Sequence, residues 1–181
     1  MTMMHILQDH NNGNTMKETI EVTKESGQFL TFQLGDELYA FDVLKTNEVL
    51  EVTQITRVPG SSDAMIGVIN LRGSVIPVIE LRKLLKMPEG KRTIDTAIII
   101  LEADYRDETV TIGVLVDSAR QVILLDKSQL EPPPRVGMNL NIEYITAIGK
   151  HDDNFIILLN SDKIFSEKEL KLAIETQNQQ S

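Results

Sequence analysis

The chain has 181 residues, enough for one domain of ordinary size or for two small subdomains that share a core. Its 18 Lys and Arg residues against 27 Asp and Glu residues give a formal charge of −9, which disfavours nucleic acid and anionic membranes as partners. The absence of cysteine excludes disulfides, thiolate metal sites and Cys nucleophiles, and it suits a reducing compartment such as the cytoplasm.

Residues 1–26 are polar, rich in Asn and Thr and without a sustained period, so we predict a flexible tail. They lack the apolar segment of a signal peptide, and no later apolar stretch is long enough to span a bilayer, so we expect a soluble protein. The first ordered element is a predicted hairpin, in which QFLTFQL and ELYAFDV flank the turn residues Gly35 and Asp36. We therefore place the start of the fold near Gln28.

The segment INLRGSVIPVIELR, residues 69–82, is largely apolar and is interrupted by one Arg-Gly pair. GVINL and SVIPVIEL on either side of Arg72 and Gly73 predict a strand, a turn and a strand, because glycine tolerates the positive φ of tight hairpins. Pro77 cannot donate a ladder hydrogen bond, so we expect its strand at a sheet edge or at a bulge. Just before this segment, residues 61–63 predict the cap of one short helical turn.

The second half of the chain continues the β pattern. LRKLLKMPEG predicts a short helical piece, TAIIILEA and TVTIGVLVD a hairpin that turns at YRDE, SARQVILLD a further strand, and EPPPRVG an extended connector. EYITAIGK and FIILLN predict a last hairpin, and SDKIFSEKELKLAIE predicts a helix with Ser161 and Asp162 as its N-cap. About ten short strands with little helix favour an all-β barrel or sandwich over a parallel α/β sheet.

The residues that carry enzyme chemistry are sparse. His5 and His10 lie in the predicted tail and His151 in a predicted turn, so neither a catalytic triad nor a histidine metal site is expected. The pair Gly90-Lys91 follows a helical piece, and Leu85 stands where a phosphate-binding loop needs glycine. We therefore predict no catalytic residue, no metal site and no cofactor.

Four segments together resemble the CheW family of bacterial chemotaxis coupling proteins. They are FLTFQLGDELYAFDVLKTNEVLEV, SSDAMIGVINLRG, IGVLVDSARQVILL and EYITAIGKHDDNFIILLNSDKIFSEKEL. The resemblance implies an all-β fold of two packed, five-stranded SH3-like barrels with a short C-terminal helix, which agrees with the strand pattern. It also implies a CheW-like domain over residues 27–175 between tails at 1–26 and 176–181, with the boundary between the two barrels left open.

The resemblance implies a non-enzymatic adaptor that couples chemoreceptors to the histidine kinase CheA at membrane-associated receptor arrays. The expected partners are the cytoplasmic signalling tip of the receptors and the regulatory domain of CheA, without nucleic acid or membrane insertion. The same module occurs within CheA and CheV, but 181 residues leave no room for their further domains. Two alternatives stay open: an adaptor of a related pathway controlling pili or gliding, and a small β-barrel enzyme with a deep polar pocket.

The resemblance also implies that four residues belong to the protein-contact surface. Thr46 and Glu48 match a strand position and an acidic residue linked in the family with receptor and array contacts, although Thr46 stands where an aliphatic residue is often found. Gly67 and Arg72 match the glycine and arginine of the central motif. For Gly67 and Gly73 the alternative explanation is backbone geometry alone. For Arg72 we favour an ion pair with a carboxylate such as Glu48 over an isolated exposed charge.

Overall fold

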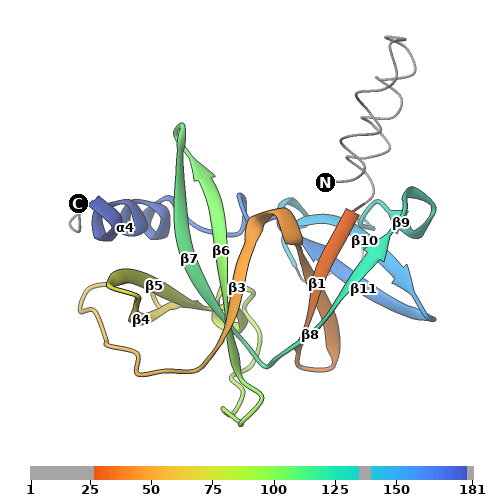
Figure 1. Cartoon of the computed structure of the whole chain (residues 1–181). Coiled ribbons are helices and arrows are strands. Elements are labelled where there is room, and N and C mark those ends of the chain that lie inside the picture. The colour runs from red at the N-terminus through yellow and green to blue at the C-terminus, as the bar shows by residue number, and fades with distance from the viewer. Residues whose placement is uncertain (1–26, 135–139, 179–181) are drawn as a thin grey trace.

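The computed structural model describes residues 27–134 and 140–178, which form two curled sheets and a C-terminal helix (Figure 1). The six-stranded sheet has the order β8-β1-β2-β11-β10-β9, with β1 (Gly27–Leu34), β2 (Glu37–Asp42), β8 (Ser118–Leu125), β9 (Leu130–Glu131), β10 (Ile145–His151) and β11 (Asn154–Leu159). The five-stranded sheet has the order β3-β6-β7-β5-β4, with β3 (Thr46–Glu51), β4 (Met65–Leu71), β5 (Ser74–Glu80), β6 (Ala97–Tyr105) and β7 (Glu108–Val116). Each sheet curls into a small SH3-like barrel, which confirms the predicted all-β class; the two-residue β9 gives the first sheet a sixth strand.

The helical elements are short, apart from the last. They are α3 (Leu81–Leu84), α4 (Glu167–Asn178) and the 3-10 turns η1 (Val43–Lys45), η2 (Lys127–Gln129) and η3 (Ile142–Tyr144). In the described part of the chain, no helix has the length and apolar character needed to cross a membrane.

The chain passes between the two barrels three times. It leaves the six-stranded barrel after β2, builds the whole five-stranded barrel, and returns to the first barrel with β8. After β11 it crosses again, so that α4 packs against β5 and β7 of the other barrel (Figure 1). The two barrels are therefore interlocked by the path of the chain.

The apolar core has three parts, which follow from the two-residue period of the strands. β6 is buried on both faces: Ile98 and Ile100 join the core of the five-stranded barrel, while Ile99 and Leu101 join a larger cluster drawn from both sheets. Phe32 and Phe41 of the six-stranded sheet belong to this shared cluster and stack with 5.0 Å between their ring centroids. The barrels are thus joined by a common core.

The predicted hairpins at Gly35–Asp36, at Arg72–Gly73 and around YRDE are all present. The edge position expected for Pro77 is wrong, because β5 is an inner strand that pairs with both β4 and β7, although the β4–β5 pairing does shift in register between Met65 and Gly67, close to the Val68–Pro77 pair. The parallel pairing with β7 covers Val78–Glu80 alone, so at Pro77 the strand is paired with β4 only and the missing N–H leaves no gap toward β7. The short helical turn that residues 61–63 were expected to cap is absent here; a single turn, in which Met65 N donates to Ser62 O at 3.1 Å, leads directly into β4.

The C-terminal helix begins later than predicted. Its first turn is capped by Ser166 and Glu169: Ser166 N donates to Glu169 Oε1 at 3.1 Å, and Glu169 N donates to Ser166 Oγ at 3.2 Å. Ile164 and Phe165 are buried in the turn before the helix, which explains why the apolar pattern starts ahead of it. The helix continues to Asn178, so residues 176–178 are helical, whereas residues 1–26, 135–139 and 179–181 lie outside the described residues.

Candidate protein-contact site

The five-stranded barrel has a seam between its two edge strands, β3 and β4, and two contacts bridge it. At one end Thr56 and Val68 form an isolated antiparallel bridge, with Thr56 N to Val68 O at 2.9 Å and Val68 N to Thr56 O at 2.8 Å. At the other end Arg72, in the turn between β4 and β5, reaches Glu48 on β3. The central motif of the sequence therefore lies along this seam.

The turn that carries Arg72 has the backbone of a tight hairpin. Arg72 has φ 51° and Gly73 has φ 87°, two successive positive values that match the twist of the flanking strands. Asn70 Oδ1 accepts a hydrogen bond from Gly73 N at 2.9 Å, which holds the turn in place. The arginine is thus presented at the tip of a rigid hairpin.

Arg72 and Glu48 form the ion pair that we favoured, and its geometry is bidentate. Arg72 Nη1 donates to Glu48 Oε1 at 2.7 Å and Nη2 donates to Oε2 at 2.8 Å. The hydrogen bonds from Arg72 hold the pKa of the Glu48 carboxyl below its ordinary value, and Glu48 raises the pKa of Arg72. The side chain of Arg72 is 73% exposed and that of Glu48 28%, so the pair is fixed in orientation yet open to solvent.

Gly67 has a structural role at the other end of the seam. A Cβ atom on this residue would lie 2.3 Å from the carbonyl oxygen of Thr56 and 2.8 Å from Ile55 Cγ2. Its φ of 153° also falls where L side chains are rarely found. Backbone geometry therefore accounts for this glycine, and a direct part in partner contacts stays a prediction.

Thr46 lies apart from the ion pair, at the start of β3. Its hydroxyl donates to the carbonyl oxygen of Asp42 at 3.0 Å, and the pairing of β3 with β6 shifts in register between Thr46 and Glu48. The neighbouring Lys45 bridges Asp104, at 2.7 Å, and Asp162, at 3.5 Å, and its hydrogen bond lowers the pKa of Asp104. Of the four predicted residues, the structure brings Glu48 and Arg72 into contact and leaves Thr46 and Gly67 elsewhere on the barrel.

A groove of about 550 Å³ runs beside the Arg72–Glu48 pair. Its lining comes from β3, β4, β5, β6, β7 and α4, and consists of Asn47, Glu48, Leu71, Arg72, Ser74, Val75, Ile76, Ile100, Thr111, Ala173 and Gln177. Leu71, Val75 and Ile76 give it apolar surface, while its two titratable lining residues are already paired with each other. Such a groove suits the side chains of a partner protein better than acid–base chemistry.

A hydrogen-bonded cluster around Arg82 joins the two barrels, and it was not predicted from the sequence. Arg82 Nε donates to Asp117 Oδ1 at 2.8 Å, and Arg82 Nη2 donates to Oδ2, which also accepts from Gly35 N at 2.8 Å. Arg82 Nη1 donates to the carbonyl oxygen of Pro88 at 2.8 Å, and the guanidinium packs so closely on Gly90 that a Cβ there would lie 2.6 Å from Arg82 Cζ. Asp117 is partly buried, which raises its pKa, but the hydrogen bonds from Arg82 and Gly35 outweigh burial and leave the pKa lowered.

The sequence offered one signal for this cluster. Arg82 is the second arginine of INLRGSVIPVIELR and lies two residues after the end of a largely apolar strand, where a charge needs a partner. Its partner Asp117 lies 35 residues later, at the crossing from β7 to β8, and Gly35 lies in the first hairpin. Three separate segments thus meet at one guanidinium.

The comparisons with known proteins agree with this architecture. The family model described as a CheW-like domain matches residues 28–169. The chain is 33% identical over 145 residues to the chemotaxis protein CheW of Klebsiella aerogenes, covering 80% of this chain and 85% of the relative. It is 32% identical over 154 residues to CheW of Bacillus subtilis, covering 85% of this chain and 96% of the relative. The crystal structure of a scaffolding CheW protein from Thermoanaerobacter tengcongensis superimposes with a TM-score of 0.70 at 32% identity, covering 80% of this chain and 90% of that one.

Proposed function

The chain belongs to the CheW family and is a chemotaxis coupling adaptor, and from this premise we propose that it joins chemoreceptors to the histidine kinase CheA. Its partners on this proposal are the cytoplasmic signalling tip of the receptors and the regulatory domain of CheA. The adaptor then works on the cytoplasmic side of membrane-associated receptor arrays, by binding alone and without chemistry of its own.

The observation that carries the proposed contact role is the bidentate Arg72–Glu48 pair at the rim of the groove. Arginine is enriched among the residues that dominate protein interfaces, because its planar fork binds carbonyl and carboxylate oxygens specifically. The pair occupies one N–H of each terminal nitrogen of Arg72, and the guanidinium has five N–H donors in all. The remaining donors are available to a partner while Glu48 fixes the plane of the guanidinium.

The groove next to the pair supplies the apolar part of the proposed contact. Leu71, Val75 and Ile76 lie on its walls, and Ala173 and Gln177 of α4 complete it. An amphipathic helix can place apolar side chains in such a groove and its polar side chains at the rim. We assign Glu48 and Arg72 to this contact surface directly and Gly67 as the residue that keeps the seam closed. Thr46, at the start of the same strand and outside the groove lining, is proposed as a separate contact.

The proposal is tested by pull-down of the CheA regulatory domain and of a receptor cytoplasmic fragment, each with the purified adaptor alone. Wild type should bind both, and Arg72→Glu should weaken binding to one or both. The matched control is Arg106→Glu, because Arg106 also lies in a hairpin turn with positive φ and pairs with a carboxylate, Glu167, at 3.2 Å. Absence of binding to both partners would overturn the coupling function, and equal losses in the two variants would remove Arg72 from the contact surface.

A further inference from the structure

The charge of the protein is strongly uneven. Residues 80–92, ELRKLLKMPEGKR, carry five cationic side chains against two carboxylates, a net charge of +3 in a chain whose total is −9. Arg57 joins this region in space, because it lines a groove together with Lys83 and Arg92. A local positive field on an acidic protein marks a place where anionic groups are attracted while the rest of the surface repels them.

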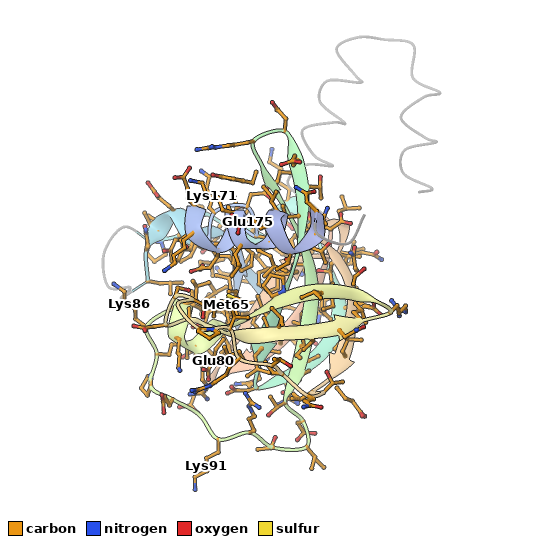
Figure 2. All side chains as sticks on the ribbon, turned by 90° about the vertical axis from the view of Figure 1, so that its left-hand side faces the viewer. Met65, Glu80, Lys86, Lys91, Lys171 and Glu175 are labelled. Atoms are coloured by element: carbon orange, nitrogen blue, oxygen red, sulfur yellow. The ribbon has the colours of Figure 1, made fainter. Side chains whose placement is uncertain are left out.

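This groove has a volume of about 520 Å³ and lies between the segment after β3, the edge strand β4, the end of β5, α3 and the following loop. Its lining consists of Ile55, Arg57, Ile66, Glu80, Lys83, Glu89, Gly90 and Arg92. None of these residues lines the groove beside Arg72. Figure 2 shows Glu80 near the middle of this side of the molecule and Lys91 on the loop that extends away below it. The two grooves are separate surfaces.

Some cationic side chains of this region have a carboxylate partner, and others do not within the described residues. Arg82 is bound by Asp117, and Lys83 lies 3.5 Å from Glu80. In contrast, the side chains of Arg57, Lys91 and Arg92 have neither an ion-pair nor a hydrogen-bond partner within residues 27–134 and 140–178, and the same holds for Lys86. All four are exposed.

Apolar groups accompany the free cations. The side chains of Ile55 and Ile66 contribute to the wall of the groove. On the same loop as Lys91 and Arg92, Ile94 is 98% exposed, the highest value among the large apolar side chains of the described residues. Free guanidinium groups beside an exposed aliphatic side chain match a partner that carries both carboxylates and an apolar residue.

We propose that this basic surface, made of Arg57, Lys91, Arg92 and Ile94, docks an acidic segment of a partner protein. Carboxylates of that segment pair with Arg57 and Arg92 across the groove, and an apolar side chain of the segment covers Ile94. The contact is additional to the one at Arg72, and charge complementarity selects it, because the remainder of this chain is acidic.

The proposal is tested by fluorescence anisotropy of the full-length chain with a fluorescein-labelled acidic peptide composed of Glu, Leu and Ala. The same peptide with Gln in place of Glu measures the part of the binding that does not depend on charge. Reversing two charges in Arg57→Glu/Arg92→Glu should weaken binding of the acidic peptide by about tenfold or more, and raising the salt concentration should reproduce the loss in wild type. Ile94→Ser should weaken binding of both peptides.

The matched control is Lys163→Glu/Lys168→Glu, which makes the same change in net charge at two exposed lysines near the start of α4. It should retain most of the binding, and all variants should keep the melting temperature of wild type. The proposal fails if the acidic peptide does not bind, or if the control loses as much affinity as Arg57→Glu/Arg92→Glu.

Two other occupants are distinguished in the same series. If sedimentation velocity shows a wild-type dimer that Arg57→Glu/Arg92→Glu dissociates, the surface binds a second copy of the chain and the proposal is overturned. If wild type co-sediments with phosphatidylserine vesicles, but the double variant does not, the surface binds a membrane and the proposal is overturned. Absence of both effects, with the peptide result above, supports an acidic protein segment.

Discussion

Replacing Gly67 with alanine should destabilise the fold far more than a glycine-to-alanine substitution in a strand usually does. The added methyl group would lie 2.3 Å from the carbonyl oxygen of Thr56 and 2.8 Å from the carbonyl carbon of the same residue. Both are backbone atoms, so the clash cannot be relieved by a side-chain rotation. The segment after β3 must move away from β4, and the seam of the barrel opens.

The magnitude follows from what this movement breaks. The bridge between Thr56 and Val68 contains two backbone hydrogen bonds, each contributing about 0.5–1.5 kcal/mol to stability. Holding alanine at a φ of 153° costs about 1 kcal/mol more. The sum is about 2–4 kcal/mol, which for a chain of this size lowers the melting temperature by about 5–15 °C.

The assay is thermal and urea unfolding of Gly67→Ala beside Gly73→Ala, a control from the same motif. Gly73 also has a positive φ, of 87°, but a Cβ there would meet no atom within 4 Å. The control should lose about 1 kcal/mol, from backbone strain alone. Equal destabilisation by the two substitutions would refute the close approach of Thr56, and with it the structural explanation of Gly67.

Three further predictions concern the Asp117 contacts, the start of α4 and the N-terminal segment. Asp117→Ala should cost about 1.5–3 kcal/mol in urea unfolding, because it removes the acceptor of Arg82 and of Gly35 N. Since the folded state lowers the pKa of Asp117, its contribution should be complete above the unfolded value of about 3.9 and be lost as the pH falls through the lower folded pKa; Asp117→Ala should flatten that decline. Glu169→Ala should cost about 1–3 kcal/mol, because it removes the side-chain acceptor of Ser166 N at the helix start and the acceptor of Ser62 Oγ, whereas an exposed Glu175→Ala should not. Deletion of residues 1–26 should leave the melting temperature and CheA binding unchanged, and a marked drop in either would show that this segment supports the fold.

Local turn chemistry explains why the hairpins could be predicted from the sequence. Gly35 and the Arg72-Gly73 pair each interrupt runs of apolar and β-branched residues, and each adopts the positive φ that a tight turn requires. The start of α4 was mistaken because Ile164 and Phe165 continue the apolar pattern without being helical. The signal of the true start was the Ser-x-x-Glu pattern at Ser166 and Glu169.

Contacts between distant segments were the harder part. The Arg72–Glu48 pair spans 24 residues, and it was expected because the family resemblance placed both residues on one surface. The Arg82–Asp117 contact spans 35 residues and depends on how β5 and the β7–β8 crossing are arranged, which no local pattern encodes. The interlocked path of the two barrels is likewise a matter of strand pairing rather than of propensity.

The most direct test of the coupling function is receptor-stimulated CheA activity in reconstituted complexes, measured with a charge swap at the seam. Arg72→Glu brings two carboxylates together and should impair coupling, while Arg72→Glu/Glu48→Arg should restore part of it, because the reversed pair can form the same bidentate contact. Thermal unfolding serves as the control, since a substitution at this exposed turn should change stability by about 0.5 kcal/mol or less. Impaired coupling in the single variant with partial recovery in the double variant is the predicted result, and full activity of Arg72→Glu would contradict the assignment of the Arg72–Glu48 pair to the signalling contact.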